Sequence, residues 1–340
     1  MNRGKGPAVV VSIREVAQRA GVSLGTVSNV LNRPEQVSPA TRRRVEAAIA
    51  ETGYVRNDSA RQLREGSSRT LAMVVLDMAN PFFTDVARGA ESEAERAGAM
   101  LVLCNSGDDQ QREQRHLEQI AQQRMRGVLI TPVDGDGEAA LKTLAAQGIP
   151  AVLVDRGSRR HDRCSVSVDD VLGGELAARH LIESGHRHLA FVGGPLTVEQ
   201  VADRLRGARE ASEEAGCRLD VVATAALTVE AGRAATETIL DADPRPTALL
   251  CANDLLALGA LQALTARGVP VPAEMAVIGY DDIDFAAAAA VPLSSVRQPR
   301  AELGRAAARL LLEEAGAQGD HRHQHVVFVP ELVVRRSTGG

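Results

Sequence analysis

The residues best suited to chemistry in this chain are acids, amides and arginines that follow apolar, strand-like runs. Carboxylate, guanidinium and carboxamide groups form paired hydrogen bonds with neighbouring hydroxyl groups. Aromatic rings beside such groups cover the C–H face of a sugar. The residues expected to act together are Asn80, Phe82, Phe83, Thr131, Asp155, Arg156, Arg204, Asn253, Asp281 and Gln298. This combination predicts a pocket for a small carbohydrate.

A second group lies near the amino end, on the outward face of a predicted helix. It comprises Ser23, Leu24, Gly25, Thr26, Ser28 and Asn29. A solvated protein face is normally richer in Glu and Lys, whereas small hydroxyls and an amide suit phosphate oxygens and the edges of DNA bases. The structural alternative is that Ser23 and Thr26 only cap and pack the helix. For Ser23 we expect both roles.

Each residue of the carbohydrate group also has a structural alternative. Asn80 would simply start a helix, Asp155 and Arg156 would pair with each other, and the two phenylalanines would belong to the core. For Asp254 we favour the role of a helix N-cap over that of a ligand contact. The shared placement at the ends of strands favours a common site.

Other groupings of reactive residues point to no enzyme, metal or cofactor. His321, His323 and His325 alternate, so on a strand they would lie on one face, which is one arrangement that binds a metal. We favour the alternative, an exposed histidine-rich turn near the carboxyl end. The acidic run 134–138 lacks the glutamate that a calcium loop requires at position 145. The chain has no GxxxxGK loop, and the glycines at 193–194 are interpreted as a turn. An enzyme is therefore the weaker hypothesis.

The elements that would position the carbohydrate group alternate between strand and helix. Strands are predicted at 71–76, 100–104, 127–130, 151–154, 188–192, 247–251 and 275–279. Helices are predicted between them, for example at 83–97, 110–124, 171–184 and 254–267. This α/β alternation predicts parallel sheets with helices on both faces, and a break near 155–169 divides them into two units. Ligands of such sheets bind at the carboxyl ends of the strands.

The elements that would position the second group are three short helices. Ser12 begins the first helix with Glu15 at the capping-box position, and Gly21 ends it. Ser23 opens the second helix, and a third runs from Ser38-Pro39 to Gly53. Three short helices with a glycine turn between the first two predict a helix-turn-helix, whose second helix enters the major groove of DNA.

Charge and composition agree with a DNA-binding head on a globular body. Residues 1–69 carry twelve Lys and Arg against six Asp and Glu, which leaves 27 basic and 38 acidic residues for the rest. This asymmetry indicates that only the head meets a polyanion. The four cysteines lack CxxC spacing and are expected to be free, mostly buried thiols. No apolar run resembles a membrane span or a signal peptide, so we expect a cytoplasmic protein with no membrane partner.

The head resembles the lactose/galactose-repressor family. The similarity is carried by residues 13–17, 20–23, 26–28, 30–32, 37–38, 53–54 and 57–63, and it extends over nearly the whole chain. It implies a transcriptional regulator, expected to be a repressor, with a periplasmic-binding-protein-like core. The expected ranges are the head at 12–56, a hinge helix and linker at 57–69, an N-terminal lobe at 70–168 and 297–327, and a C-terminal lobe at 169–296 and 328–340.

The resemblance also assigns a role to the hinge. The segment that matches Asn57–Arg64 is implied to fold into a short helix on specific DNA, with Asn57 and Arg64 among the contacts and Leu63 as a wedge in the minor groove. Seven or eight residues are too few for a stable isolated helix, so folding would be coupled to binding. The alternative is that Leu63 packs on the head or the core. Many relatives carry Arg where Asn29 stands, and Gly25 has no side chain to read a base.

The core resembles ribose-type members of the group. Phe82, Phe83, Asp155, Arg156, Arg204, Asn253, Asp281 and Gln298 match positions that contact the ligand there. The resemblance implies a small neutral sugar, with a pentose as the predicted class. Two departures are Thr131, where Asn is frequent, and Leu227, where an aromatic ring usually covers the sugar. We further expect a homodimer on a near-palindromic double-stranded DNA operator, because paired heads suit two half-sites. A sugar-binding protein without a DNA role is disfavoured by residues 12–69.

Overall fold

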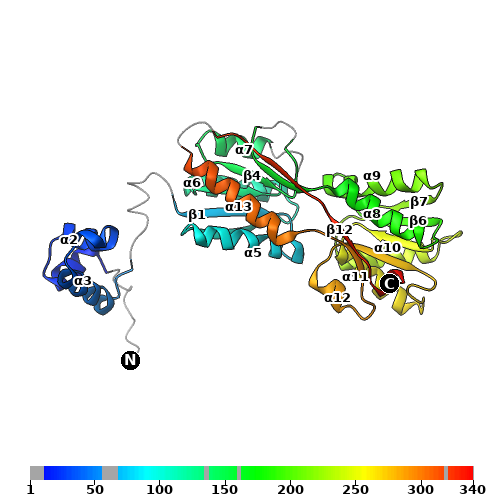
Figure 1. Cartoon of the computed structure of the whole chain (residues 1–340), viewed down its shortest axis with the longest axis horizontal. Helices are drawn as coiled ribbons and strands as arrows, with labels where there is room; N and C mark the ends of the chain where they lie inside the picture. The colour runs from blue at the N-terminus through cyan, green and yellow to red at the C-terminus, as the bar shows by residue number, and fades with distance from the viewer. Residues whose placement is uncertain (1–10, 56–67, 134–137, 159–161, 318–320, 340) are drawn as a thin grey trace, which may run out of the picture. The chain divides into compact units, whose positions relative to one another are not determined.

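The computed structural model describes residues 11–55, 68–133, 138–158, 162–317 and 321–339 (Figure 1). The chain divides into two compact units, Met1–Gly66 and Ser67–Gly340, which we call the head and the core. The hinge residues Asn57, Leu63 and Arg64 lie outside the described residues. No helix in the described ranges is long and apolar enough to cross a membrane.

The head is a helix-turn-helix, as the sequence predicts. Its elements are α1 (Ile13–Ala20), α2 (Leu24–Asn32), the 3-10 turn η1 (Pro34–Gln36) and α3 (Pro39–Thr52). The Ser12 backbone N–H donates to Glu15 Oε2 over 2.6 Å and starts α1. Gly21 ends α1 with φ 63°, a left-handed conformation that glycine adopts without a Cβ clash. Val16, Val27 and Val45 are fully buried and join the three helices.

The core contains two six-stranded sheets, and each sheet defines a lobe. The first lobe has the strand order β11-β5-β4-β3-β1-β2, with all neighbours parallel. Its strands are β1 (Thr70–Val75), β2 (Met100–Asn105), β3 (Gly127–Ile130), β4 (Ala151–Val154), β5 (Ser165–Val168) and β11 (His325–Phe328). Its helices are α5 (Pro81–Arg96), α6 (Gln110–Gln122), α7 (Glu138–Ala145) and α13 (Arg300–Gly316). Helix α13 packs beside α5, and α6 packs beside α7 (Figure 1).

The second lobe repeats this arrangement with the order β12-β10-β9-β8-β6-β7. Its strands are β6 (His188–Val192), β7 (Arg218–Val222), β8 (Ala248–Cys251), β9 (Ala276–Asp281), β10 (Ser294–Arg297) and β12 (Glu331–Val333). Its helices are α8 (Asp170–Glu183), α9 (Glu199–Glu214), α10 (Val229–Leu240), α11 (Asp254–Ala266), α12 (Asp284–Ala288) and the 3-10 turn η2 (Arg336–Thr338). Strand β12 is antiparallel to β10, so this sheet is not wholly parallel.

The predicted alternation is confirmed, with differences at the edges of the sheets. The seven predicted strands are present, but β5, β7, β10, β11 and β12 are not among the predicted ranges. Three of these are edge strands, and polar residues interrupt their short sequences. The strand register also places Arg297 in the second sheet and Phe328 in the first. The expected lobe ranges are therefore wrong by one residue at each of these two crossings.

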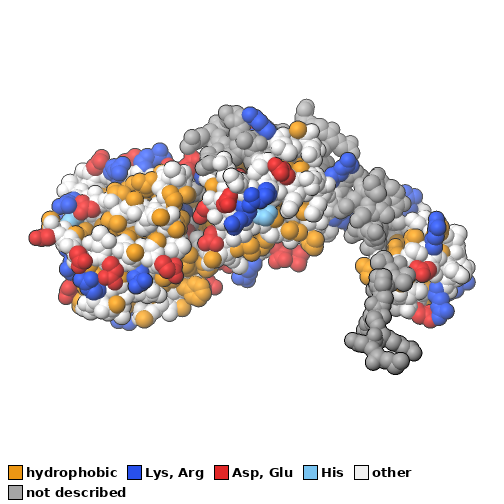
Figure 2. All heavy atoms as spheres, turned by 180° about the vertical axis from the view of Figure 1, so that it is seen from behind, with side chains coloured by type: hydrophobic (Ala, Val, Ile, Leu, Met, Phe, Trp, Pro, Cys, Tyr) orange, Lys and Arg blue, Asp and Glu red, His pale blue; other side chains and the backbone are white. Residues whose placement is uncertain are grey.

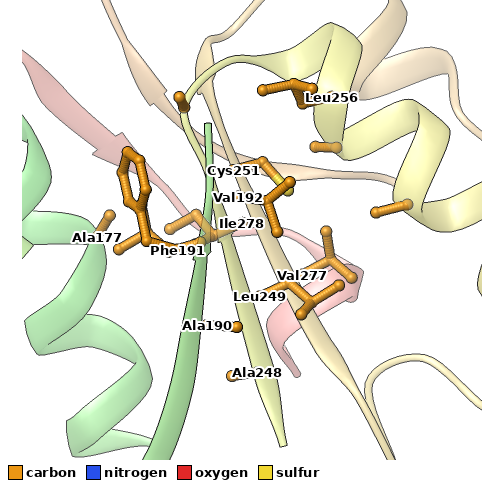
Figure 3. Close-up of a cluster of buried hydrophobic side chains, with 14 of the residues drawn as sticks. Ala177, Ala190, Phe191, Val192, Ala248, Leu249, Cys251, Leu256, Val277 and Ile278 are labelled. Atoms are coloured by element: carbon orange, nitrogen blue, oxygen red, sulfur yellow. The ribbon is translucent and has the colours of Figure 1, made fainter. Parts of the chain in front are cut away.

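Apolar side chains fill both faces of the second sheet. Figure 3 shows Phe191 directed toward Ala177 of α8, while Val192 and Cys251 lie on the opposite side, toward Leu256 of α11. Alternate side chains of a strand point to opposite faces, so both faces need covering helices. On the outer surface, Figure 2 shows acidic, basic and apolar side chains mixed over the visible face of the core.

Candidate effector pocket and DNA-reading helix

A cavity of about 80 Å³ lies between the two lobes, at the carboxyl ends of their strands. Eight residues predicted from the sequence line it: Asn80, Phe82, Phe83, Asp155, Arg204, Leu227, Asn253 and Asp281. The expected position of the pocket in an α/β core therefore agrees with the cavity that the structure contains. Asn80 also caps α5, because its Oδ1 accepts a hydrogen bond from the Phe82 backbone N–H over 3.0 Å.

Arg204 is the only arginine or lysine that lines this cavity among the described residues. It lies in the second turn of α9 rather than at the start of the helix. Its Nε donates to Asp170 Oδ1 over 2.8 Å, its Nη1 donates to the Ala252 carbonyl over 2.8 Å, and its guanidinium carbon lies 3.8 Å from the centre of the Tyr280 ring. Burial opposes the charge, but the nearby carboxylates of Asp170 and Asp281 raise the pKa of Arg204. The cation is therefore held in a fixed orientation.

Asp155 reaches the cavity from the end of β4 with an unusual backbone. Its φ is 57°, in the left-handed region that non-glycine residues adopt infrequently. The Gln200 amide of the second lobe donates to the Asp155 carbonyl over 2.6 Å and to Asp155 Oδ2 over 3.0 Å. Asp155 Oδ1 is buried and has no hydrogen-bond partner among the described residues. Burial, and then the charges of Asp170 and Asp281, raise the pKa of Asp155 to about 8.

Asp281 reaches the cavity from the end of β9, also with a positive φ, of 104°. Gln298 Nε2 donates to Asp281 Oδ1 over 2.7 Å, and Arg204 Nη1 lies 3.9 Å from the same oxygen. Burial raises the pKa of Asp281 to about 6, and Arg204 and Gln298 oppose this shift. Gln298 Oε1 is buried and unpaired among the described residues. Gln298 thus orients Asp281 from behind the cavity.

Three predicted residues do not line the cavity: Thr131, Arg156 and Gln298. Thr131 is fully buried, and its hydroxyl donates to the Val154 carbonyl over 2.9 Å. Arg156 does not pair with Asp155. It instead crosses to the second lobe, where its Nη1 lies 3.3 Å from Glu199 Oε2. Thr131, Arg156 and Gln298 therefore lie beside the cavity and support the elements that form its walls.

The N-cap predicted for α11 is wrong by one residue. Asn253 caps α11, because its Oδ1 accepts from the Leu256 N–H over 3.0 Å, and its amide donates to the Leu227 carbonyl over 3.2 Å. Asp254 is fully buried in the first turn, where it accepts from Ser295 Oγ over 2.7 Å and from the Ile283 N–H over 2.8 Å. Burial raises the pKa of Asp254 well above its usual value.

Several residues of the pocket were not predicted. They include Asp77, Asp108, Gln200 and Thr228, together with Asp170 and Tyr280, which hold Arg204. Asp108 follows β2 after a short turn, so the strand-end rule would have found it. Its φ is 56°, and burial together with Asp77 raises its pKa. Gln200 and Asp170 lie at the starts of helices, and no local pattern marks them.

In the head, α2 presents the side chains expected to meet DNA. Ser23 Oγ accepts from the Thr26 N–H over 3.1 Å and lies 2.9 Å from Thr26 Oγ1, so the predicted cap is present. Leu24, Gly25 and Asn29 are exposed, whereas Thr26 and Ser28 are half-buried. The Ser28 side chain is engaged within the helix, because Asn32 Nδ2 donates to Ser28 Oγ over 3.2 Å as well as to the Ser28 carbonyl over 2.8 Å.

Comparisons with known proteins agree with this organisation. Residues 12–57 match the family of bacterial regulatory proteins of lacI type, and residues 178–338 match the periplasmic binding protein-like domain. The ribose operon repressor of Escherichia coli (strain K12) is 34% identical over 330 residues, which cover 96% of this chain and all of the relative. The transcriptional repressor PurR of Mannheimia succiniciproducens is 33% identical over 332 residues, which cover 96% of this chain and 98% of the relative.

A solved structure shows the same architecture. The lac repressor dimer bound to operator and the anti-inducer ONPF is 29% identical, with a TM-score of 0.85, and the match covers 96% of this chain and 99% of that one. The two curated relatives are transcriptional repressors. The chain belongs to the lacI family of bacterial regulatory proteins, as a DNA-binding repressor with a ligand-binding core.

Proposed function

We propose that this repressor is controlled by a small neutral sugar of pentose size, bound between the lobes. The observation that carries the proposal is Asp155 Oδ1, a buried acceptor at the cavity with no hydrogen-bond partner among the described residues. An unsatisfied buried polar atom costs about 1–3 kcal/mol. A sugar hydroxyl would satisfy it, while the Arg204 guanidinium and the Asn253 amide lie in the same cavity to orient the neighbouring hydroxyls.

The size and charge of the cavity favour such a ligand. A volume of 80 Å³ corresponds to roughly five to eight water-sized spheres at ~10–15 Å³ each. This suits a monosaccharide better than a disaccharide or a nucleotide. Four aspartates and one arginine line the cavity, and burial, followed by the charges of Asp170 and Asp281, raises the pKa of Asp155. A sugar phosphate would add negative charge where it is already disfavoured.

Control of DNA binding would follow from closure of the lobes. Asp155 belongs to the first lobe, whereas Arg204, Asn253 and Asp281 belong to the second. A ligand that touches both sets stabilises the closed arrangement in proportion to its difference in affinity for the two states. The first lobe follows the hinge segment directly in the chain, so closure would change the spacing of paired hinges. The ability of the hinge residues Asn57, Leu63 and Arg64 to bind DNA, with Leu63 in the minor groove, would change with this spacing.

We further propose that the repressor acts in the cytoplasm as a homodimer on a near-palindromic operator. The exposed residues of α2, Ser23, Leu24, Gly25 and Asn29, with Thr26 and Ser28 beside them, form one small reading surface. Two such surfaces would read two half-sites. Met100 and Leu103 on edge strand β2 and Val221 on edge strand β7 are exposed apolar residues, which supports an interface along these edges.

A thermal-shift screen of pentoses, hexoses, sugar phosphates and purine bases on the full chain tests the ligand class, since a ligand of the folded core raises its melting temperature. Calorimetry then compares Arg204→Ala and Asp281→Asn with the surface controls Arg179→Ala and Asp220→Asn. We expect a pentose to stabilise the protein. We expect the pocket variants to lose at least about tenfold in affinity, because truncating one partner of a buried charged hydrogen bond costs ~2–5 kcal/mol. Binding of a sugar phosphate or purine with no response to pentoses would contradict the ligand class, and wild-type affinity in both pocket variants would contradict the site.

A further inference from the structure

A compact group of metal-binding side chains lies in the first lobe, away from the effector pocket. Cys164 immediately precedes β5, Glu314 is in the last turn of α13, and His321 and His323 lie in the segment that leads into β11. One ligand atom from each of these four residues lies within 4.8 Å of the others. The third histidine of the alternating triplet, His325, is not part of the group, because its Nδ1 lies 2.9 Å from Ser165 Oγ.

The separations between the ligand atoms are close to those of a tetrahedral site. His321 Nε2 lies 3.2 Å from Cys164 Sγ and 3.9 Å from Glu314 Oε2. His323 Nδ1 lies 3.9 Å from each of the same two atoms. Bonds of ~2.0–2.3 Å to a tetrahedral zinc ion place its ligand atoms about 3.3–3.8 Å apart. Shifts of a few tenths of an ångström at these four contacts would therefore accommodate the ion.

Hydrogen bonds reach the sulfur atom of this group, from His321 Nε2 and from the Gln324 N–H, but they leave one carboxylate oxygen unpaired among the described residues. Glu314 Oε2 is buried and has no hydrogen-bond partner among the described residues, and the Cys164 side chain is fully buried. A buried thiol and a partly buried carboxylate thus lie beside two partly buried imidazole rings, and a cation bound by all four would pair with the unsatisfied carboxylate oxygen.

The backbone around the group is fixed by the sheet. The Ser165 N–H donates to the Gln324 carbonyl over 3.0 Å, and the Gln324 N–H donates to Cys164 Sγ over 3.4 Å. Strand pairing between β5 and β11 therefore sets the distance from Cys164 to His323 without help from a ligand. The group lies at the amino ends of β5 and β11, whereas the effector pocket lies at the carboxyl ends of the parallel strands.

We propose that Cys164, Glu314, His321 and His323 form a binding site for a divalent transition metal of the zinc type. Thiolate, imidazole and carboxylate are the ligands that zinc takes in proteins, and four protein ligands are typical of a structural site. The metal joins the end of α13, the segment before β11 and the start of β5. It therefore stabilises the edge of the first sheet against local opening.

Titration of the untagged full-length chain with Co²⁺ tests the site, because cobalt reports both a thiolate ligand and tetrahedral geometry in its absorption spectrum. We expect a sulfur-to-cobalt charge-transfer band, one Co²⁺ per chain, displacement by Zn²⁺, and a higher melting temperature with Zn²⁺. Cys164→Ser should abolish the charge-transfer band. His321→Gln and His323→Gln should each weaken Zn²⁺ binding by at least about tenfold.

Matched controls separate the site from adventitious binding. Cys217→Ser and His186→Gln remove a cysteine and a histidine elsewhere in the core, and both variants should bind Co²⁺ as the wild-type chain does. Each ligand variant should retain its circular-dichroism spectrum and its operator affinity without metal, which shows that it is folded. Absence of the charge-transfer band in the wild-type chain, or equal Zn²⁺ affinity in the folded Cys164 and histidine variants, would overturn the proposal.

Discussion

Single residues at the pocket combine backbone strain with buried carboxyl groups. Asp155 and Asp281 have φ values of 57° and 104°, and Asp108 and Asp282 are also in the left-handed half of the map. Each such conformation costs on the order of 1–3 kcal/mol and persists only where the surrounding structure enforces it. Asp155, Asp281 and Asp108 line the interlobe cavity. The strain therefore aims carboxyl groups into a cavity at the ends of strands, where an unstrained backbone would direct them elsewhere.

The pKa of Asp155 leads to a prediction about pH. Its value in the folded chain is about 8, above the unfolded value of 3.8. The folded state therefore binds the proton more tightly, and its stability falls as pH rises from about 4 to about 8. Asp155→Asn removes this titration, so its melting temperature relative to wild type should rise between pH 5 and pH 9. We expect a change of at least about 2–4 °C, the shift that 1 kcal/mol produces in a protein of this size.

The measurement is a series of thermal melts of the ligand-free chain at fixed ionic strength. Asp220→Asn is the matched control, because hydrogen bonds with Arg218 and His188 lower the pKa of Asp220 despite some burial. Asp220 therefore titrates below this pH range. Parallel pH profiles for wild type and Asp155→Asn would show that Asp155 is ionised throughout.

Asn29 is the residue of the head that we propose reads a base edge. Its amide is exposed on α2, and a carboxamide pairs with two atoms of an adenine edge. Asn29→Ala should lower the ratio of operator to random-DNA affinity by about tenfold, since such a pair contributes ~1–3 kcal/mol of discrimination. Competition binding at fixed salt measures this ratio. Gln36→Ala should leave it unchanged, because this exposed amide lies outside α2, on the 3-10 turn η1. A similar loss in both variants would count against base reading by Asn29.

At the scale of elements, close helix packing determines where Arg204 points. Helices α8 and α9 approach each other through glycines, and a Cβ at Gly207 would lie 1.8 Å from the Val171 carbonyl oxygen. On α8, a Cβ at Gly174 would lie 1.9 Å from the carbonyl oxygen of Arg204 itself. Only glycine at these positions lets α9 lie near enough for Arg204 to reach Asp170 over 2.8 Å.

Gly207→Ala should therefore weaken both stability and ligand binding. Overpacking of this kind costs about 1–3 kcal/mol and displaces α9, so the melting temperature and the affinity for the identified effector should both fall. Gly316→Ala is the control, because nothing lies within 4 Å of its Cβ position at the end of α13. That variant should be neutral or slightly more stable, since alanine favours a helix by up to about 1 kcal/mol over glycine. If the Gly207→Ala chain is destabilised but binds the effector with wild-type affinity, the close packing of α8 and α9 does not determine the orientation of Arg204.

At the scale of the whole molecule, the two lobes share three chain crossings and several direct contacts. The chain passes from β5 to α8, from β10 to α13 and from β11 to β12. Arg300 marks the second crossing, where its Nη1 donates to the Asp281 carbonyl over 2.6 Å and its Nε donates to Asp85 Oδ2 over 2.8 Å. Gln200 links the lobes at the cavity through Asp155. Relative movement of the lobes therefore acts on the same residues that would hold the effector.

The proposed wedge at Leu63 gives a prediction for the complex with DNA. Leu63→Ala should reduce the operator bend and weaken operator affinity by at least about tenfold, because an inserted apolar side chain stabilises the kinked base step. A circular-permutation bend assay and salt-dependent binding measure the two effects, and the salt dependence should persist because it arises from phosphate contacts. Leu196→Ala removes an exposed leucine of the core and serves as the control. A wild-type bend angle in Leu63→Ala would contradict the wedge.

The sequence by itself determined the element types, the family and the general place of the pocket. Apolar runs such as 127–130 and 151–154 match β3 and β4 residue for residue, because a strand buried on both faces admits few polar residues. The helix N-caps at Ser23 and Ser38 could be predicted from the sequence equally well, since an N-cap depends on neighbours within one helical turn. The strand-end rule then located Asp155 and Asp281.

Only the tertiary structure decided which strand ends meet and what each polar side chain contacts there. Edge strands β7 (RLDVV) and β12 (ELV) are short and mix polar with apolar residues, so they carry no clear periodic signal. Arg204 bonds to Asp170, which is 34 positions away, and Cys164 meets His321 across 157 positions. Such pairs depend on the sheet order and on helix packing, in which many distant contacts act together. A single sequence displays local preferences, whereas these partners are selected by the cooperative packing of the complete fold.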